Sequence, residues 1–198
     1  MIPKIIHYCW LSGDDFPPLI QKCIESWKEK LPDYEFMLWD TNRFKLESNI
    51  WVQQAFETKK YAFAADYIRL YAVYNYGGIY LDTDVEVVKS FNNLLDRPYI
   101  VGAEVHGIIE AGIFGAEKNM SWLKQCLDYY DGKSFINEDG TFNTLGLPRI
   151  MTAQISKTRT FIEILPEKAE SSLQIKNEDI LYIYNIFTQT RETISGLY

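Results

Sequence analysis

The hydrophobic pattern of the chain alternates between short apolar runs and longer stripes of helical period. Apolar runs at 4–10 and 34–40 are typical of buried strands. Between them, residues 18–30 place apolar side chains about every 3.6 positions, which predicts an amphipathic helix. Residues 61–78, rich in Ala and Leu, predict a longer helix that closes on a glycine pair.

The same alternation continues along the chain. Further elements are expected as short helices at 41–48 and 49–58, strands at 79–84, 85–88, 99–104, 108–116 and around 173–184, helices at 119–131 and 148–158, and a loop at 132–146. Strands that alternate with helices predict an α/β fold with a mostly parallel central sheet flanked by helices. In such sheets ligands bind beyond the carboxyl ends of the strands.

Length, charge and cysteine content narrow the class of protein. The 198 residues suit one domain, and we expect it to span 1–198. A net charge of −7 argues against a broad nucleic-acid surface. Cys9, Cys23 and Cys126 lie far apart without a CxxC motif, so we expect neither a zinc cluster nor a disulfide framework, and a cytoplasmic location. We also expect no signal peptide, and no apolar stretch approaches the roughly 20 residues of a membrane span.

Two acids interrupt an apolar run in "YGGIYLDTDVEVV", residues 76–88. An unpaired buried charge costs several kcal/mol, so Asp82 and Asp84 predict a positive partner. If the strand continues through Asp84, both carboxylates lie on one face of it. Carboxylates suit Mg²⁺ or Mn²⁺, ions that bind substrate phosphates as well. The alternative is a turn at the strand end with solvated acids.

Three other charged side chains stand in apolar surroundings. Asp66 and Arg69 lie three residues apart, on one face of the expected helix. Such a pair can hold the vicinal hydroxyls of a sugar, or form an ion pair on the solvated side of the helix. Glu110, inside the apolar stretch "IIEAGIF", is a candidate to face a donor or acceptor sugar.

The segment "FAADYIRLYAVYNYGGIYLDTDVEVVKSF" resembles the signature of the DXD-containing sugar transferases of glycosyltransferase family 32. That family includes yeast initiating α-1,6-mannosyltransferases, vertebrate α-1,4-galactosyl- and α-1,4-N-acetylglucosaminyltransferases, and bacterial capsule enzymes; clostridial glucosylating toxins have a related core. "IPKIIHYCWLSGDDFPP" and "ESWKEKLPDYEFMLWDTN" resemble the start of the family. The resemblance covers roughly residues 1–95.

The resemblance implies a GT-A fold and a metal-dependent, retaining transfer of a hexose from a UDP- or GDP-sugar. Asp82 and Asp84 would engage Mn²⁺ or Mg²⁺ and the donor diphosphate, and Glu110 is the candidate near the reactive carbon. The implied donor contacts are Asp66 and Arg69 on the sugar hydroxyls, Tyr80, Trp10 on the base, Asn42 near the base or ribose, and Gly77 and Gly78 through a close backbone. From the sequence alone, Trp10 and Tyr80 are explained equally well as core residues as they are as donor contacts. Asn42 is likewise explained as a helix cap.

The resemblance also implies partners and a setting. The acceptor would be a saccharide or a lipid-linked oligosaccharide in bacterial capsule or other surface polysaccharide synthesis. The expected location is the cytoplasm, with peripheral association at the inner membrane face if the acceptor is lipid-linked.

Two alternatives belong to other classes of protein. "IYLDTDV" also fits the motif of haloacid-dehalogenase-type phosphatases, with Asp82 as nucleophile and Asp84 as general acid or base, although that fold usually carries the motif near its start. A non-catalytic nucleotide-sugar-binding scaffold is the other. The ending "NIFTQTRETISGLY" lacks the His- and Ser-Trp-containing closing segment of similar family members. We therefore expect a chain truncated at its C-terminus, or a site that closes differently.

Overall fold

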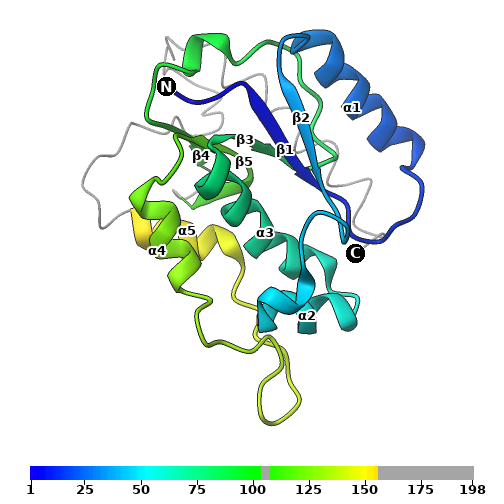
Figure 1. Cartoon of the computed structure of the whole chain (residues 1–198), viewed down its shortest axis with the longest axis vertical. Helices are drawn as coiled ribbons and strands as arrows, with labels where there is room; N and C mark the ends of the chain where they lie inside the picture. Colours follow the sequence, from blue (N-terminus) through cyan, green and yellow to red (C-terminus); the bar gives the residue numbers. More distant parts are fainter. Residues whose placement is uncertain (104–107, 156–198) are drawn as a thin grey trace, which may run out of the picture.

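The computed structural model describes residues 1–103 and 108–155, and a five-stranded sheet forms its centre (Figure 1). The strands are β1 (Ile5–Cys9), β2 (Glu35–Trp39), β3 (Gly78–Leu81), β4 (Tyr99–Ala103) and β5 (Ile109–Ala116), in the order β2-β1-β3-β5-β4. β1 pairs in parallel with β2 and β3, whereas β5 is antiparallel to both β3 and β4. Four of these five strands therefore run in one direction, which confirms the mostly parallel α/β sheet.

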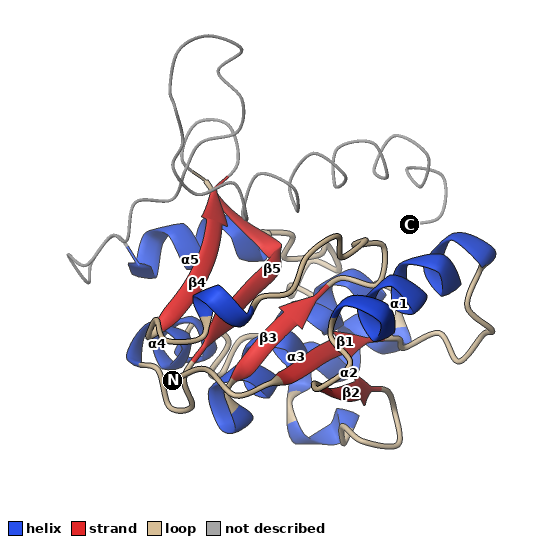
Figure 2. Ribbon diagram, turned by 90° about the horizontal axis from the view of Figure 1, so that it is seen from above, coloured by secondary structure: helices blue, strands red, loops and turns tan. Residues whose placement is uncertain are grey.

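Helices cover both faces of the sheet (Figure 2). They are α1 (Pro18–Lys30), α2 (Ile50–Glu57), α3 (Tyr61–Tyr76), α4 (Ser121–Asp128) and α5 (Leu147–Ile155), with single 3-10 turns η1 (Leu46–Ser48) and η2 (Asn92–Leu94). The apolar residues of α1 pack on one face together with the segment 85–95. Those of α2, α3, α4 and α5 pack on the other face.

The central strand β3 shows why the sequence forms this sandwich. All four of its residues are buried. Ile79 and Leu81 join the core on the α1 side, whereas Tyr80 joins the core on the α3 side. A strand covered on both faces has no polar alternation, and this explains its continuous apolar run.

The glycine pair that ends α3 serves packing at the amino end of β3. Gly77 is the C-cap of α3 with φ 67°, and its N–H donates to the carbonyl of Val73 at 2.8 Å. Gly78 has φ 109°, and a Cβ there would lie 2.6 Å from the carbonyl oxygen of Ile5. Both glycines lie at the opposite end of β3 from Asp82. The structure thus corrects their assignment as donor contacts, and we leave them out of the candidate site.

The predicted strand at 85–88 is wrong. β3 ends at Leu81, and a turn follows in which the N–H of Val85 donates to the carbonyl of Asp82 at 3.1 Å. The backbone beyond it bonds to side chains of α1: the carbonyl of Val85 accepts from Trp27 Nε1 at 2.6 Å, and the N–H of Val87 donates to Ser26 Oγ at 2.9 Å. The alternating apolar residues of 85–88 are thus explained by packing against α1, and the segment is not a strand of the sheet.

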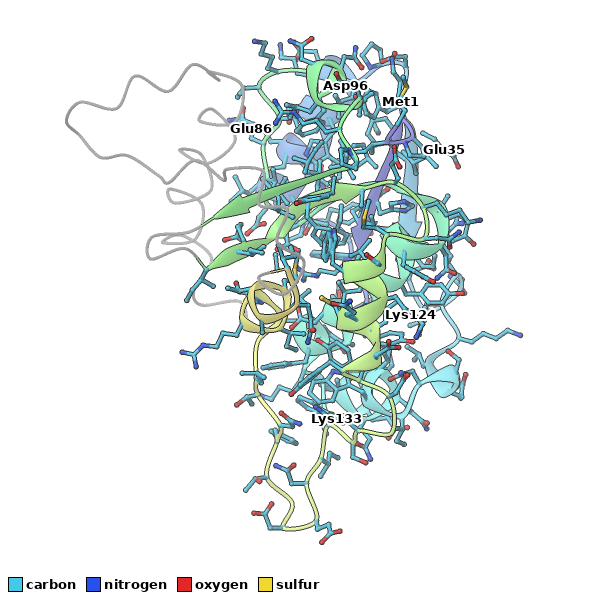
Figure 3. All side chains as sticks on the ribbon, turned by 90° about the vertical axis from the view of Figure 1, so that its left-hand side faces the viewer. Met1, Glu35, Glu86, Asp96, Lys124 and Lys133 are labelled. Atoms are coloured by element: carbon cyan, nitrogen blue, oxygen red, sulfur yellow. The ribbon has the colours of Figure 1, made fainter. Side chains whose placement is uncertain are left out.

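Other boundaries differ less from the expectation. The segment 41–48 holds only turns and η1, and α4 is shorter than the predicted 119–131. An irregular hairpin beyond Lys133 extends from the body of the molecule, in agreement with the predicted loop (Figure 3). The end of the helix predicted at 148–158 and the strands near 173–184 lie outside the described residues. Within 1–103 and 108–155, no helix combines the length and hydrophobicity needed to cross a membrane.

Candidate active site

Apart from Gly77 and Gly78, the predicted site residues lie at or near one edge of the sheet. β1, β2 and β3 are parallel, so the residues that follow them meet at their carboxyl ends. Trp10 follows β1, Asn42 lies in the turn after β2, and Asp82 follows β3. β5 runs in the reverse direction, which brings Glu110 at its start to the same edge. The chain passes from β1 to β2 on one side, while β3 lies on the other, and this is a topological switch point where α/β sheets bind ligands.

Asp82 and Arg69 form the central ion pair of this edge. Arg69 Nη2 lies 3.3 Å from Asp82 Oδ1, and Arg69 Nη1 donates to Oδ2 at 3.5 Å. Arg69 is 7% exposed, whereas the side chain of Asp82 keeps 28% of its surface. The positive partner predicted for the acidic motif is therefore Arg69, and one carboxylate of the motif still faces the outside.

Arg69 is fixed by groups from three elements. Its Nη1 donates to the carbonyl of Ala111 in β5 at 2.9 Å, and its Nε donates to the carbonyl of Ala65 in α3 at 3.3 Å. The guanidinium also lies over the ring of Tyr80, 4.6 Å from its centroid. Because these contacts fix the orientation of the guanidinium, its positive charge is available to other groups from one direction only.

Asp66 lies beside Arg69 in the interior. Its Oδ1 is 3.5 Å from Arg69 Nη2, and its Oδ2 accepts from the N–H of Leu147, at the start of α5, at 3.4 Å. Burial raises the pKa of Asp66 to about 6, against the lowering effect of Arg69. Asp66 and Arg69 thus form an ion pair within α3, which was one of the two alternatives for them. The pair faces the acidic motif, however, and not the solvent.

Tyr80 acts on the site through Asp82. Its hydroxyl donates to Asp82 Oδ1 at 2.9 Å, and its ring is buried in a stack with Phe114. Burial raises the pKa of Tyr80 well above its ordinary value, so the phenol keeps its proton as a donor. The structure therefore gives Tyr80 the position of a residue that orients a carboxylate from within the core.

A β-bulge in β5 supplies backbone groups that the sequence analysis missed. The pairs Val101↔Phe114 and Gly102↔Glu110 leave the segment 111–113 without partners in β4. The carbonyl of Gly112 accepts from the N–H of Asp82 at 2.8 Å, and the adjacent Ala111 carbonyl holds Arg69. The sequence did contain a signal for this bulge: Gly112 stands two residues after Glu110 inside the predicted strand. Glycines inside strands often mark bulges near active sites.

Glu110 is buried within this bulge. Its Oε1 accepts from the N–H of Gly112 at 2.8 Å. The side chain thus stabilises the backbone that holds Arg69 and Asp82. Glu110 lies at the same edge of the sheet as Asp82, and its observed contact positions the backbone of the bulge.

Asp84 lies in the turn after β3, where strand alternation no longer applies. β3 ends at Leu81, so the condition under which Asp82 and Asp84 would share a strand face is not met. Asp82 faces Arg69 on the α3 side, whereas the charge of Asp84 acts on Cys23 of α1. Burial first, and then Asp84, raise the pKa of the Cys23 thiol to about 11.

The donor set at this edge fits a hard divalent cation with few protein ligands. Two carboxylates follow β3, one of them partly exposed. Across the described part of the chain, no three His, Cys, Asp or Glu side chains are grouped as a metal would require. Mg²⁺ usually binds through one or two carboxylates, waters and substrate phosphates, which is the arrangement that these residues allow.

Trp10 and Asn42 occupy loops beyond β1 and β2. Trp10 is half-buried, its Nε1 donates to the carbonyl of Asp14 at 2.7 Å, and its ring lies against Phe16. Asn42 is exposed, and both its N–H and its amide donate to the carboxylate of Asp40. Trp10 therefore has a braced ring at the edge, and Asn42 forms part of a turn that Asp40 stabilises.

Comparison with known proteins shows which family this part of the chain is similar to. Residues 17–101 match the model described as a glycosyltransferase sugar-binding region containing a DXD motif. The segment holds Asp66, Arg69 and the acids after β3, so the resemblance seen in the sequence is confirmed over the core of the site.

Curated relatives and a solved structure agree with this DXD glycosyltransferase match. Inositol phosphoceramide mannosyltransferase 3 of Schizosaccharomyces pombe is 31% identical over 63% of the chain and 36% of its own length. Mannosyl phosphorylinositol ceramide synthase SUR1 of Saccharomyces cerevisiae is 34% identical over 50% of the chain and 26% of its own length. The matched part of the chain thus spans 36% and 26% of the length of these two relatives.

The PaToxG glycosyltransferase is one of the solved structures that match this chain. It superposes with a TM-score of 0.57 at 17% identity, over 98% of the chain and 78% of PaToxG. This likeness shows the fold, which is of the GT-A type, as the resemblance implied.

Proposed function

We propose that this chain binds a nucleotide-sugar and transfers its hexose to a saccharide or lipid-linked acceptor, with retention of configuration. The observation that carries the proposal is the network in which Arg69 holds Asp66 and Asp82 at the carboxyl edge. It combines a fixed cation, a partly exposed carboxylate and a buried acid of raised pKa, within the region shared with DXD glycosyltransferases. Mannosyltransferases among the relatives make mannose the first sugar to test.

The chemistry follows from the charge that develops on the donor. As the glycosidic bond breaks, the nucleoside diphosphate gains negative charge. A bound divalent cation stabilises that charge as a Lewis acid. Asp82 and Asp84 would hold the cation, while Asp66 and Arg69 orient the sugar. Tyr80 keeps the Asp82 carboxylate in place by its hydrogen bond.

The base and the acceptor belong to the same proposal. Trp10 offers an aromatic face for the base, and Asn42 lies in the loop beyond the neighbouring strand. We propose a role in bacterial surface polysaccharide synthesis, at the cytoplasmic side of the membrane where a lipid-linked acceptor would lie. This role rests on the resemblance to capsule enzymes alone.

A thermal-shift panel tests the proposal. The probes are UDP, GDP, UDP-glucose and GDP-mannose, each with and without Mn²⁺. A ligand at about 100 times its Kd adds roughly 2.7 kcal/mol, or on the order of 5–10 °C in Tm for a chain of this size. We expect one nucleotide to raise the Tm only with Mn²⁺, and Asp82→Ala to abolish the shift. A normal shift in Asp82→Ala would contradict the metal assignment.

Sugar release distinguishes the transferase from the two alternatives. Hydrolysis or transfer of the hexose from the bound donor supports the enzyme. Donor binding without turnover favours the nucleotide-sugar-binding scaffold. Turnover of a phosphate monoester with no effect of nucleotides favours the phosphatase, although Asp82 already accepts from Tyr80 and Arg69, which is a poor setting for a nucleophile.

A further inference from the structure

Two adjacent residues of α1 bind the backbone that follows the acidic motif. Trp27 Nε1 donates to the carbonyl of Val85 at 2.6 Å, and the N–H of Val87 donates to Ser26 Oγ at 2.9 Å. A carbonyl and an N–H two residues apart are the groups that a neighbouring parallel strand would bind with one of its residues. Ser26 and Trp27 together take the place of that residue.

Other contacts fix both side chains. The ring of Trp27 is fully buried, and Tyr8 of β1 meets it edge-on with centroids 5.4 Å apart. The hydroxyl of Ser26 donates to the carbonyl of Cys23 at 2.6 Å, which leaves the oxygen to accept from Val87. α1 therefore presents one donor and one acceptor in fixed directions.

The two bonds anchor one end of the turn that carries Asp84. At the other end, the N–H of Asp82 donates to the carbonyl of Gly112 in β5 at 2.8 Å. Between the two ends, the N–H of Val85 donates to the carbonyl of Asp82 at 3.1 Å. Asp84 is buried between these anchors, so its place depends on β5 on one side and on α1 on the other.

We propose that Ser26 and Trp27 are positioning residues for the divalent cation, because they hold the backbone after Asp84 so that this acid can share one ion with Asp82. The inference rests on the proposed function, in which the two acids hold the cation. Groups that orient metal ligands without touching the metal contribute to metal affinity. Loss of either bond from α1 lets the turn move and weakens the site for the ion.

The variants Trp27→Phe and Ser26→Ala each remove one of the two bonds. The measurement is the Kd of UDP and of GDP by calorimetry, once with Mn²⁺ and once with EDTA. We expect Mn²⁺ to tighten the binding of one nucleotide to the wild type, and this effect to be about three- to tenfold smaller in both variants. The Kd in EDTA should keep its wild-type value, because no group that contacts the nucleotide is changed.

Two control variants separate positioning from a general loss of packing. Trp51 is also fully buried, and its Nε1 donates to the carbonyl of Phe63 at 3.1 Å, in the core on the other face of the sheet. Trp51→Phe should therefore lower the Tm and leave the Mn²⁺ effect at its wild-type size. Ser26→Thr keeps the hydroxyl and should keep the Mn²⁺ effect as well.

Hydrogen exchange of the Val87 amide gives a result that needs neither nucleotide nor metal. The amide should exchange faster in Ser26→Ala than in the wild type, because its acceptor is gone. If Trp27→Phe does not fold, Ser26→Ala with Ser26→Thr carries the test.

Three outcomes have distinct meanings. A wild-type Mn²⁺ effect in folded Trp27→Phe and Ser26→Ala would overturn the inference. An equally reduced effect in Trp51→Phe would overturn it too, because any loss of packing would then be enough. A wild type that binds nucleotide equally with Mn²⁺ and with EDTA is a different result, because it removes the metal from the proposed function itself.

Discussion

Arg69 shows how a single residue joins parts of the chain that the sequence presents separately. The spacing of Asp66 and Arg69 predicted their shared helix face, and the structure agrees. The contact with Asp82 was predicted only as a need for some positive partner, because nothing local links residues 13 apart. The same guanidinium also binds the Ala111 carbonyl of a later strand, for which side-chain patterns give no signal.

Replacing Arg69 by Met tests this connection. The change keeps the aliphatic stem and leaves the acids Asp66 and Asp82 without their cation. Removing one partner of a buried ion pair costs on the order of 3–5 kcal/mol, so the free energy of unfolding in urea should fall by about that amount. The double variant Asp66→Asn with Arg69→Met should regain part of the loss. Wild-type stability in the single variant would contradict the role of Arg69.

His7 is neutral in the core and makes stability depend on pH. Its Nδ1 accepts from Trp39 Nε1 at 3.1 Å, and its Nε2 bonds the carbonyl of Gly77 at 2.8 Å. Burial lowers its pKa to about 4, although the bond to Gly77 works against the shift. Between pH 6.5 and 4 the unfolded chain therefore binds a proton that the folded chain does not.

Acidification from pH 6.5 to 4 should cost the wild type about 3 kcal/mol through His7. Asp66 opposes this over part of the range, because its raised pKa makes the folded chain bind a proton from about pH 6 downwards. The test is the difference in unfolding free energy between wild type and His7→Gln at several pH values, since Asp66 cancels in it. The variant should gain on the wild type as pH falls, and a constant difference would show that His7 does not titrate this way.

At the scale of elements, β5 determines the geometry of the site. The apolar pattern predicted the strand, and its bulge places Ala111 and Gly112 against Arg69 and Asp82. A bulge depends on how two strands pair, which local sequence does not specify. This is why the sequence singled out Glu110 as a candidate site residue but did not predict its bond to its own strand.

Two variants of Glu110 separate a positioning role from a chemical one. Glu110→Gln keeps an oxygen that accepts from the N–H of Gly112, whereas Glu110→Ala leaves that buried N–H unpaired. We expect the Ala variant to lose about 1–3 kcal/mol of stability and to bind the donor more weakly, and the Gln variant to behave as wild type. Normal donor binding without sugar transfer in Glu110→Gln would instead assign Glu110 to the chemistry.

The start of β3 offers a test of the corrected role of the glycines. Gly78→Ala places a Cβ 2.6 Å from the Ile5 carbonyl at φ 109°, whereas Gly13, with φ 76°, has no atom within 4 Å of such a Cβ. Gly13→Ala should cost about 1 kcal/mol for backbone strain alone, and Gly78→Ala about 2–4 kcal/mol in thermal or urea unfolding. Folded Gly78→Ala should bind nucleotide-sugar normally; a selective loss of binding would return Gly78 to the site.

At the scale of the molecule, the alternation of strands and helices was enough to predict an α/β sheet and the sheet edge that carries the candidate site. The reversed direction of β5 and the missing strand at 85–88 were not predictable in the same way. Both depend on partners that are distant in the sequence: the backbone at Val85 and Val87 bonds to side chains of α1 and not to another strand.

The sheet order predicts that the family-matched segment does not fold alone. A fragment of residues 1–103 lacks β5, which lies between β3 and β4, and also α4 and α5, which cover the face packed by α3. We expect it to show no cooperative thermal transition by circular dichroism, whereas the whole chain does. A sharp transition in the fragment would mean that β1, β2 and β3 with α1 and α3 suffice.

The bond from the Asp82 N–H to the Gly112 carbonyl has a consequence for how the site is observed. Its hydrogen exchanges with solvent only when β3 and β5 separate at this edge. The exchange rate of one amide therefore measures how often the carboxylate, the guanidinium and the bulge come apart together. A ligand that bridges them slows that exchange even if it never touches the amide.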